Sequence, residues 1–268
     1  MNGAWLRRGI LLSASLALAG CSSTETEQAD ATIPPACEST EFEGSAFVHC
    51  IAVPGRNTIH TALAARNGKL YRSLSQLAVN RPAQSHAVAF AMNAGMFDPG
   101  GFPVGYYVED GDRKKELNTN DGPGNFHMKP NGVFYGEARG HWRIATAEAF
   151  ARSVDHRPDF GTQSGPMLVI DGELHPAIDA DGQSKNLRNG VGIDAIGAAH
   201  FVISEEPVSF GKLARYFRDG LKCANALYLD GSVSSLWDPD HGRVDGGPEL
   251  GPLIVVEKSA KAQETKAD

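Results

Sequence analysis

One aspartate stands where the sequence changes from an apolar run to a turn of small residues. Residues 226–229 predict a short buried strand, and Asp230 follows it directly. A strand that ends on a carboxylate holds that group rigidly, and small residues beside it leave room for a ligand. The small residues here are Gly231, Ser232, Ser234 and Ser235. The same pattern fits an ordinary Asp-Gly turn, so this segment alone leaves a catalytic and a structural interpretation open.

Other polar residues stand at the ends of further short apolar runs. They are Asn93, Asn131, Ser164, Arg188 and Asn189. Their amide, hydroxyl and guanidinium groups suit the binding of a polar or anionic ligand. Spacing along the chain does not show that they converge on one cavity. Asn93 also suits a turn or a cap, and Arg188 also suits a solvated loop beside Lys185.

Five segments carry a resemblance to a known family. They are residues 91–105 (AMNAGMFDPGGFPVG), 130–135 (PNGVFY), 163–172 (QSGPMLVIDG), 187–193 (LRNGVGI) and 227–237 (LYLDGSVSSLW). In this order they resemble the phosphodiester glycosidase family, the bacterial relatives of the "uncovering enzyme" that removes N-acetylglucosamine from a sugar phosphodiester. The resemblance covers residues 47–256.

The chain departs from the family pattern in two places. The sequence from Asn93 to Phe97 reads Asn-Ala-Gly-Met-Phe, where the general family has Asn-Gly-Gly-Phe. Ser232 and Val233 take the place of two glycines in the last motif, Asp-Gly-Gly-Gly-Ser. The second departure narrows the site and changes its hydrogen-bonding groups.

The resemblance implies that these polar residues converge and that the chain hydrolyses a sugar 1-phosphodiester in an envelope glycan. Phosphate is a good leaving group, so cleavage of the anomeric C–O bond has little need of a general acid. One carboxylate then suffices, and Asp230 would act as base or nucleophile. Arg188 would hold the phosphate through two parallel hydrogen bonds. The substrate-binding residues implied are Asn93, Gly95, Asn131, Ser164, Gly165, Asn189, Gly231, Ser232 and Ser234.

Two other functions remain open at this stage. The same pocket would serve a non-catalytic envelope lipoprotein that binds a glycan or a partner. Ser209 and Lys212 match the Ser-x-x-Lys motif of acyl-transferring enzymes, although Ser209 also suits a helix N-cap. Glu205 and Glu206 follow an apolar run and are weaker candidates for a second acid.

The N-terminus predicts a lipid anchor. Arg7 and Arg8 precede an apolar run that ends in Leu-Ala-Gly and Cys21, a lipobox in which Cys21 is acylated after cleavage. We therefore expect a signal peptide over residues 1–20, a flexible tether over residues 21–36 and a membrane attachment through Cys21. Serines after the cysteine favour the outer membrane, with the domain facing the periplasm.

Cysteines and charge give further expectations. Cys37 and Cys50 would close a short loop in an oxidising compartment, leaving Cys223 unpaired. The formal net charge of −7, with no dense run of Lys and Arg, argues against nucleic acid as a partner. No Cys or His spacing is typical of a metal site, so we expect neither a metal nor a cofactor.

The elements that must position these residues are short strands and a few helices. Apolar runs predict strands over residues 47–53, 59–63, 86–92, 133–135, 167–170, 191–196, 200–204 and 254–256, and residues 106–109 and 114–117 suit a hairpin around Asp110 and Gly111. Ser73, Thr146 and Ser209 suit the N-caps of three helices, the last running over residues 210–219. Strands and helices do not alternate strictly, which predicts a single α+β domain over residues 37–257 with a mixed, mostly antiparallel sheet. Residues 258–268 form a charged tail that we expect to be disordered.

Overall fold

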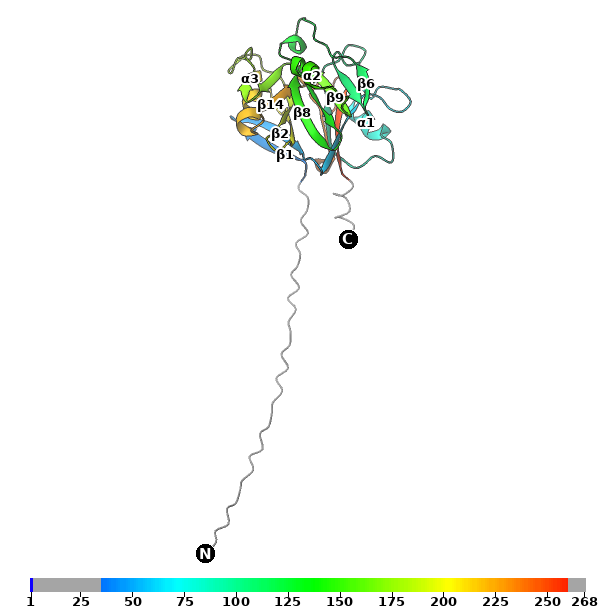
Figure 1. Cartoon of the computed structure of the whole chain (residues 1–268), viewed down its shortest axis with the longest axis vertical. Coiled ribbons are helices and arrows are strands. Elements are labelled where there is room, and N and C mark those ends of the chain that lie inside the picture. The colour runs from blue at the N-terminus through cyan, green and yellow to red at the C-terminus, as the bar shows by residue number, and fades with distance from the viewer. Residues whose placement is uncertain (2–34, 260–268) are drawn as a thin grey trace. The chain divides into compact units, whose positions relative to one another are not determined.

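Antiparallel sheets build the described part of the chain (Figure 1). The structure is a computed structural model that describes Met1 and residues 35–259. The first sheet orders β1 (Cys37–Phe42), β2 (Ser45–Ala52), β13 (Ala199–Ser204), β12 (Asn189–Ile193), β14 (Asn225–Tyr228), β10 (Met167–Ile170) and β11 (Glu173–Leu174). The second orders β16 (Arg243–Val244), β15 (Leu236–Asp238), β4 (Val88–Asn93), β17 (Leu253–Lys258) and β3 (Asn57–Ala62). The third orders β6 (Asp112–Lys115), β5 (Tyr107–Glu109), β9 (Phe160–Ser164), β7 (Gly132–Glu137) and β8 (Gly140–Thr146).

Helices are few and short. They are α1 (Leu74–Asn80), α2 (Ala147–Ser153) and α3 (Phe210–Arg215), with a wider π turn η2 (Tyr216–Gly220) and the 3-10 turns η1 (Asn125–His127), η3 (Gly231–Val233) and η4 (Pro239–His241). The hydroxyls of Ser73, Thr146 and Ser209 each accept a hydrogen bond from the first turn of their helix, as expected of N-caps.

The third helix is shorter than the sequence predicts. α3 ends at Arg215, and the chain continues as η2, in which Leu221 N donates to Tyr216 O over 2.9 Å. The wider turn lets two successive aromatic side chains, Tyr216 and Phe217, lie in the core at 4% and 0% exposure.

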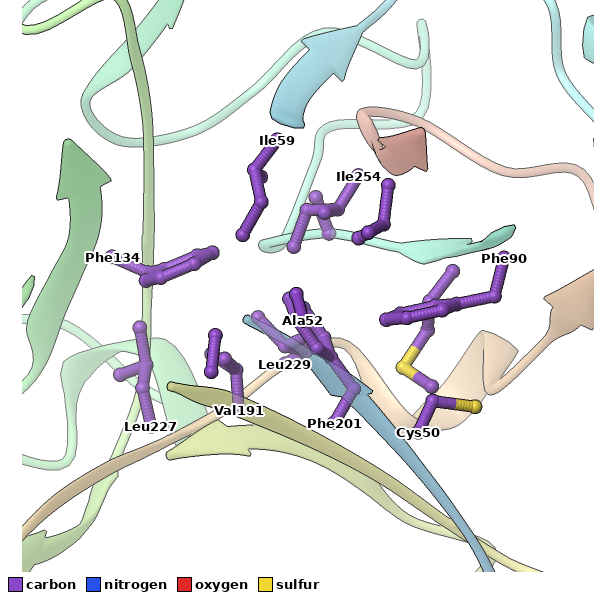
Figure 2. Close-up of a cluster of buried hydrophobic side chains, with 14 of the residues drawn as sticks. Cys50, Ala52, Ile59, Phe90, Phe134, Val191, Phe201, Leu227, Leu229 and Ile254 are labelled. Carbon is purple, nitrogen blue, oxygen red and sulfur yellow. The ribbon is translucent and has the colours of Figure 1, made fainter. Parts of the chain in front are cut away.

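The core lies where the three sheets face one another (Figure 2). Phe134 of the third sheet and Phe90 of the second both meet Phe201 of the first, with ring centroids 5.8 and 5.2 Å apart. All three side chains are fully buried. A fully buried phenylalanine contributes about 1.5–3 kcal/mol to folding, so this contact holds the sheets together strongly.

The α+β class predicted from the sequence is confirmed, but the strands form three sheets and not one. The strands β1, β8, β9, β11, β15 and β16 were not foreseen. β8 alternates exposed and buried residues and contains Gly, His and Arg, while β9 is buried although it contains Thr, Gln and Ser. Polar residues in a covered strand hide the apolar signal on which prediction depends. At the other end, β17 includes Lys258, one residue beyond the expected domain boundary.

The expected anchor cannot be compared with the structure. Cys21 and almost all of the predicted signal peptide and tether lie outside the described residues, as do residues 260–268. Among the residues that are described, no helix is long and apolar enough to cross a membrane.

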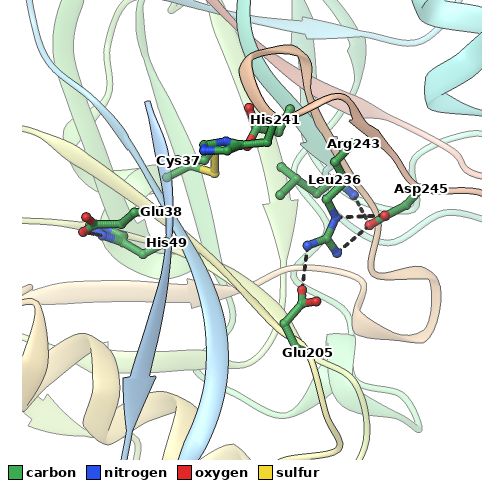
Figure 3. The surroundings of a disulfide bond; sticks show 10 residues. Cys37, Glu38, His49, Glu205, Leu236, His241, Arg243 and Asp245 are labelled. Carbon is green, nitrogen blue, oxygen red and sulfur yellow. Dashed lines mark hydrogen bonds and ion pairs between the residues drawn. A yellow bond between two sulfur atoms is a disulfide. The ribbon is translucent and has the colours of Figure 1, made fainter. Parts of the chain in front are cut away.

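A disulfide between Cys37 and Cys50 joins β1 to β2, where the two residues are directly paired (Figure 3). Nearby, Arg243 lies between Glu205, at 2.6 Å, and Asp245, at 2.9 Å. The pair with Glu205 connects β16 of the second sheet to the end of β13 in the first, so Glu205, the weaker candidate acid, is engaged by Arg243. Cys223 is a free thiol, and burial raises its pKa to about 12.

We predict that the Cys37→Ala, Cys50→Ala double variant loses about 3 kcal/mol of unfolding free energy, because its unfolded chain regains the freedom of a short loop. Urea unfolding with and without dithiothreitol measures this loss. The reductant should destabilise the wild-type domain and leave the double variant unchanged. Equal wild-type midpoints in both buffers would contradict the prediction.

Candidate active site

The side-chain amide of Asn93 connects two sheets at the end of β4. The residue is 1% exposed. Its Oδ1 accepts hydrogen bonds from Asn189 Nδ2 at 2.8 Å and from Ser235 N at 3.0 Å. Its Nδ2 donates to the backbone carbonyl of Asp230 at 2.8 Å. Asn93 therefore fixes the start of β12 and the turn that follows β14 relative to β4.

Asp230 is the half-buried N-cap residue of η3. Its Oδ1 accepts from Ser232 Oγ at 2.5 Å and from Ser232 N at 3.3 Å, and Oδ2 has no hydrogen-bond partner among the described residues. Burial raises the pKa of the Asp230 carboxyl above its usual range, and the two bonds from Ser232 oppose that rise. The result is a carboxylate with one oxygen held and the other available to a ligand or water.

Two further residues complete this group around Asp230. Ser234 Oγ donates to Gly231 O at 3.0 Å and to Asn189 Oδ1 at 3.4 Å. We call the group the Asp230 cluster; its members are Asn93, Asn189, Asp230, Gly231, Ser232 and Ser234. All six were proposed from the sequence, and the structure brings them together.

Arg188 is buried at 1% exposure and does not lie in a solvated loop. Its Nε donates to Val208 O at 2.8 Å and its Nη2 to Ser184 O at 3.1 Å, while the guanidinium carbon lies 3.5 Å from the centre of the Phe210 ring. Burial lowers the pKa of Arg188, and the neighbouring Tyr228 opposes that change. No carboxylate among the described residues forms an ion pair with it. Its charge is thus not neutralised locally.

The position of Arg188 corrects the expected phosphate contact. Two parallel hydrogen bonds to phosphate need an open edge of the guanidinium, and this edge is covered. Tyr228 stands between Arg188 and the Asp230 cluster: Arg188 Nη1 lies 3.5 Å from the Tyr228 hydroxyl, which packs against Gly231. Sequence reasoning placed Tyr228 only in a buried strand and missed this role.

Asn131, Ser164 and Gly165 form a group of their own, separate from the Asp230 cluster. Asn131 Nδ2 donates to Phe126 O at 2.9 Å, so its amide is committed to the protein. A Cβ atom on Gly165 would lie 2.8 Å from Asn131 Cβ, which makes this glycine a packing requirement. Ser164 Oγ is buried with no hydrogen-bond partner. No hydrogen bond among the described residues joins the side chains of this group to the Asp230 cluster.

Gly95 links the segment after β4 to the third sheet. Its N donates to Thr162 Oγ1 at 3.1 Å, and a Cβ atom would lie 2.2 Å from Gln163 O. Gly95 is therefore needed for close backbone packing. Gln163, which the sequence did not single out, accepts from Tyr106 N and Asn118 N, both at 2.9 Å. The only feature of the sequence that pointed to Gln163 was its position directly before the Ser-Gly-Pro motif.

Two surface hollows are formed by the described residues, and neither is lined by Asp230. One has a volume of about 170 Å³ and is lined by two of the residues that contact the Arg188 guanidinium, Ser184 and Phe210. Another, near the disulfide, is lined by Glu38, Asp238 and Arg243. Among the described residues, no group of three or more His, Cys, Asp or Glu side chains is placed to hold a metal ion.

The Ser-x-x-Lys motif has a structural explanation. Ser209 Oγ accepts a hydrogen bond from Lys212 N at 3.1 Å as the cap of α3. Lys212 Nζ donates to Ser45 Oγ at 2.8 Å and to Glu43 O at 2.9 Å, so its amine serves a different contact. This pair does not have the arrangement of a nucleophile and its base.

The family model for phosphodiester glycosidases matches residues 86–244, more than half of the chain. The chain belongs to the phosphodiester glycosidase family. Membership supports a hydrolase role. The Asp230 cluster lies wholly within the matched residues, as do Arg188 and Tyr228.

The chain is also similar to several proteins of known sequence or structure. The uncharacterized protein YigE of Escherichia coli (strain K12) is 38% identical over 173 residues, which span 64% of this chain and 66% of that protein. The catalytic domain of zebrafish N-acetylglucosamine-1-phosphodiester alpha-N-acetylglucosaminidase, auto-inhibited by its pro-peptide, shares the fold with a TM-score of 0.57 at 13% identity over 86% of each chain. A hypothetical protein from Synechocystis has a TM-score of 0.52 at 15% identity, over 83% of this chain and 61% of its own.

We predict that Asn93→Ala lowers the unfolding free energy by about 2–4 kcal/mol, because Asn189 Nδ2 and Ser235 N lose a buried acceptor. Chemical denaturation measures the loss. Asn80→Ala is the matched control, since the Asn80 amide makes its bonds at the surface and its removal should cost less than about 1 kcal/mol. Similar losses in both variants would refute the role of Asn93.

Proposed function

We propose that this protein hydrolyses the glycosidic C–O bond of a sugar 1-phosphodiester in an envelope glycan. The observation that carries the proposal is the Asp230 carboxylate. It is the one acid of the Asp230 cluster, one oxygen is fixed by Ser232, and the other has no protein partner among the described residues. N-acetylglucosamine 1-phosphodiester is the first substrate to test, because the zebrafish relative is named for it.

A single carboxylate suits this reaction because the leaving group is a phosphate monoester. Ordinary glycosides need a second, protonated carboxyl to assist a poor leaving group, and phosphate does not. Asp230 would deprotonate the attacking water or attack the anomeric carbon itself. The charge of Arg188, held in a region of low dielectric constant behind Tyr228, would stabilise the negative charge that builds on the departing oxygen.

The other members of the cluster divide into positioning and binding groups. Asn93 is committed to three internal hydrogen bonds, so we assign it the positioning of the Asp230 turn. Ser232 is exposed and Ser234 is half-buried, and their hydroxyls are the cluster's accessible groups for sugar hydroxyls or an N-acetyl group. Val233 fills space that a glycine would leave open, because it packs into the core at 9% exposure.

We expect Asp230→Asn to lower kcat at least about 10²-fold, because an amide can neither accept a proton nor attack the anomeric carbon. Free sugar and phosphate monoester released from N-acetylglucosamine α-1-phosphodiester should appear in equal amounts with wild-type protein. The substitution is nearly isosteric, so thermal unfolding should change little. A wild-type protein that binds the diester but never releases either product would favour the alternative, a glycan-binding envelope protein.

We expect Ser232→Ala to move the acid limb of the kcat/KM profile to higher pH. The Ser232 hydroxyl and N–H stabilise the ionised carboxylate, so loss of the hydroxyl raises the pKa of Asp230 further. Since catalysis uses the ionised form, kcat/KM near the acid limb should fall further than kcat/KM on the plateau at higher pH, where only the sugar contact of Ser232 is lost. Ser153→Ala, in an exposed helix position, is the control. A limb that stays in place would argue against Asp230 as the titrating base.

A further inference from the structure

Tyr228 lies between the buried cation and the turn that carries Asp230. It is the last residue of β14, at 3% exposure, and Phe210 packs edge-on against its ring with centroids 4.7 Å apart. The strand and Phe210 fix the ring, so the hydroxyl has a defined position. A Cβ atom on residue 231 would lie 2.1 Å from that hydroxyl oxygen, so the absence of a side chain at Gly231 makes room for it.

The hydrogen-bonding capacity of this hydroxyl is only partly used. Arg188 Nη1 lies 3.5 Å from the oxygen, and a guanidinium can only donate, so the Tyr228 oxygen accepts there. The backbone N–H of Gly231, which donates to Leu229 O at 3.0 Å, lies close to the same oxygen. The hydroxyl hydrogen therefore needs an acceptor elsewhere, and the hydrogen bonds of the described residues supply none.

We propose that Tyr228 donates its hydroxyl hydrogen to a phosphate oxygen of the substrate bound at the Asp230 cluster, and so transmits the charge of Arg188 to that group. This inference rests on the proposed function and names the phosphate contact that the covered guanidinium cannot make itself. Tyr228 donates a hydrogen bond to the phosphate oxygen and keeps its proton throughout. A substrate oxygen that carries more negative charge in the transition state strengthens this bond, so Tyr228 contributes to kcat as well as to binding.

The surroundings favour an anionic acceptor. Arg188 has no carboxylate partner among the described residues, and its donors polarise the phenol toward stronger donation. Burial raises the pKa of Tyr228 while Arg188 and Gly231 oppose the rise, and the phenol stays neutral at physiological pH. A neutral phenol donates to phosphate, whereas a phenolate would repel it.

Tyr228→Phe tests the proposal, because it removes the hydroxyl and keeps the ring. Two probes separate the phosphate from the sugar: an N-acetylglucosamine C-glycosidic phosphonate ester, in which CH₂ replaces the anomeric oxygen, and the neutral methyl α-N-acetylglucosaminide. We expect the variant to bind the phosphonate roughly 10- to 100-fold more weakly, the range for one hydrogen bond to a charged group. Affinity for the neutral glycoside should stay unchanged.

Tyr216→Phe is the matched control, since Tyr216 is a buried tyrosine of the same hydrophobic cluster and makes no contact with Arg188. It should bind both probes like the wild type. Replacing all tyrosines with 3-fluorotyrosine, which makes the phenol a stronger donor, should tighten phosphonate binding in the wild-type sequence. This second measurement does not require the Phe variant to fold.

The outcomes distinguish this proposal from the proposed function. Weaker phosphonate binding in Tyr228→Phe, without any diester turnover by the wild type, would keep the contact and reject the hydrolase. Turnover by the wild type with equal phosphonate affinity and equal kcat in Tyr228→Phe would keep the hydrolase and overturn the contact. A parallel loss for the neutral glycoside would also overturn it, because such a loss reports a disturbed pocket.

Discussion

The site depends on a buried amide that must have all its hydrogen bonds made. Asn93 ends β4 at the place where the second sheet meets the first, and its two polar atoms bind groups from β12, from the turn after β14 and from the segment before β15. An unpaired buried amide costs several kcal/mol, so this set of bonds forms together or not at all. Gly95, two residues on, joins the same segment to β9 of the third sheet. Three sheets thus position one short turn.

The turn carries a carboxylate, Asp230, and a buried cation, Arg188, lies behind it. Asp230 is half-buried and faces an available position, whereas Arg188 is covered by Phe210 and by two carbonyl groups. Tyr228 contacts Arg188 on one side and Gly231 on the other, and Asp230 and Arg188 do not form an ion pair. In the proposed reaction each charge acts on the substrate, the carboxylate at the sugar and the arginine, through Tyr228, at the phosphate. The serine that replaces a family glycine at position 232 also bonds to Asp230, so this departure tunes the carboxylate.

Sequence reasoning found the Asp230 cluster because polar residues at strand ends leave a local pattern. It could not show convergence from spacing, since Asn93 and Asp230 are far apart in the chain, and the family resemblance supplied that step. Arg188 was expected at the phosphate, but its neighbour Lys185 suggested a solvated loop and nothing local revealed its burial. Tyr228 and Gln163 were overlooked because, inside a strand, an aromatic or amide residue predicts packing. Their roles follow from partners far away in the sequence, Arg188 for Tyr228 and Tyr106 and Asn118 for Gln163, which no local window contains.

The central claim is cleavage of the anomeric C–O bond, and hydrolysis in ¹⁸O-labelled water tests it most directly. Cleavage at carbon and cleavage at phosphorus release the same sugar and the same phosphate monoester, so product identity alone does not separate them. The account predicts that the phosphate monoester carries no ¹⁸O, as read from the isotope shift of its ³¹P resonance, because its oxygen comes from the substrate. An ¹⁸O-labelled phosphate monoester would mean attack at phosphorus and would contradict the account.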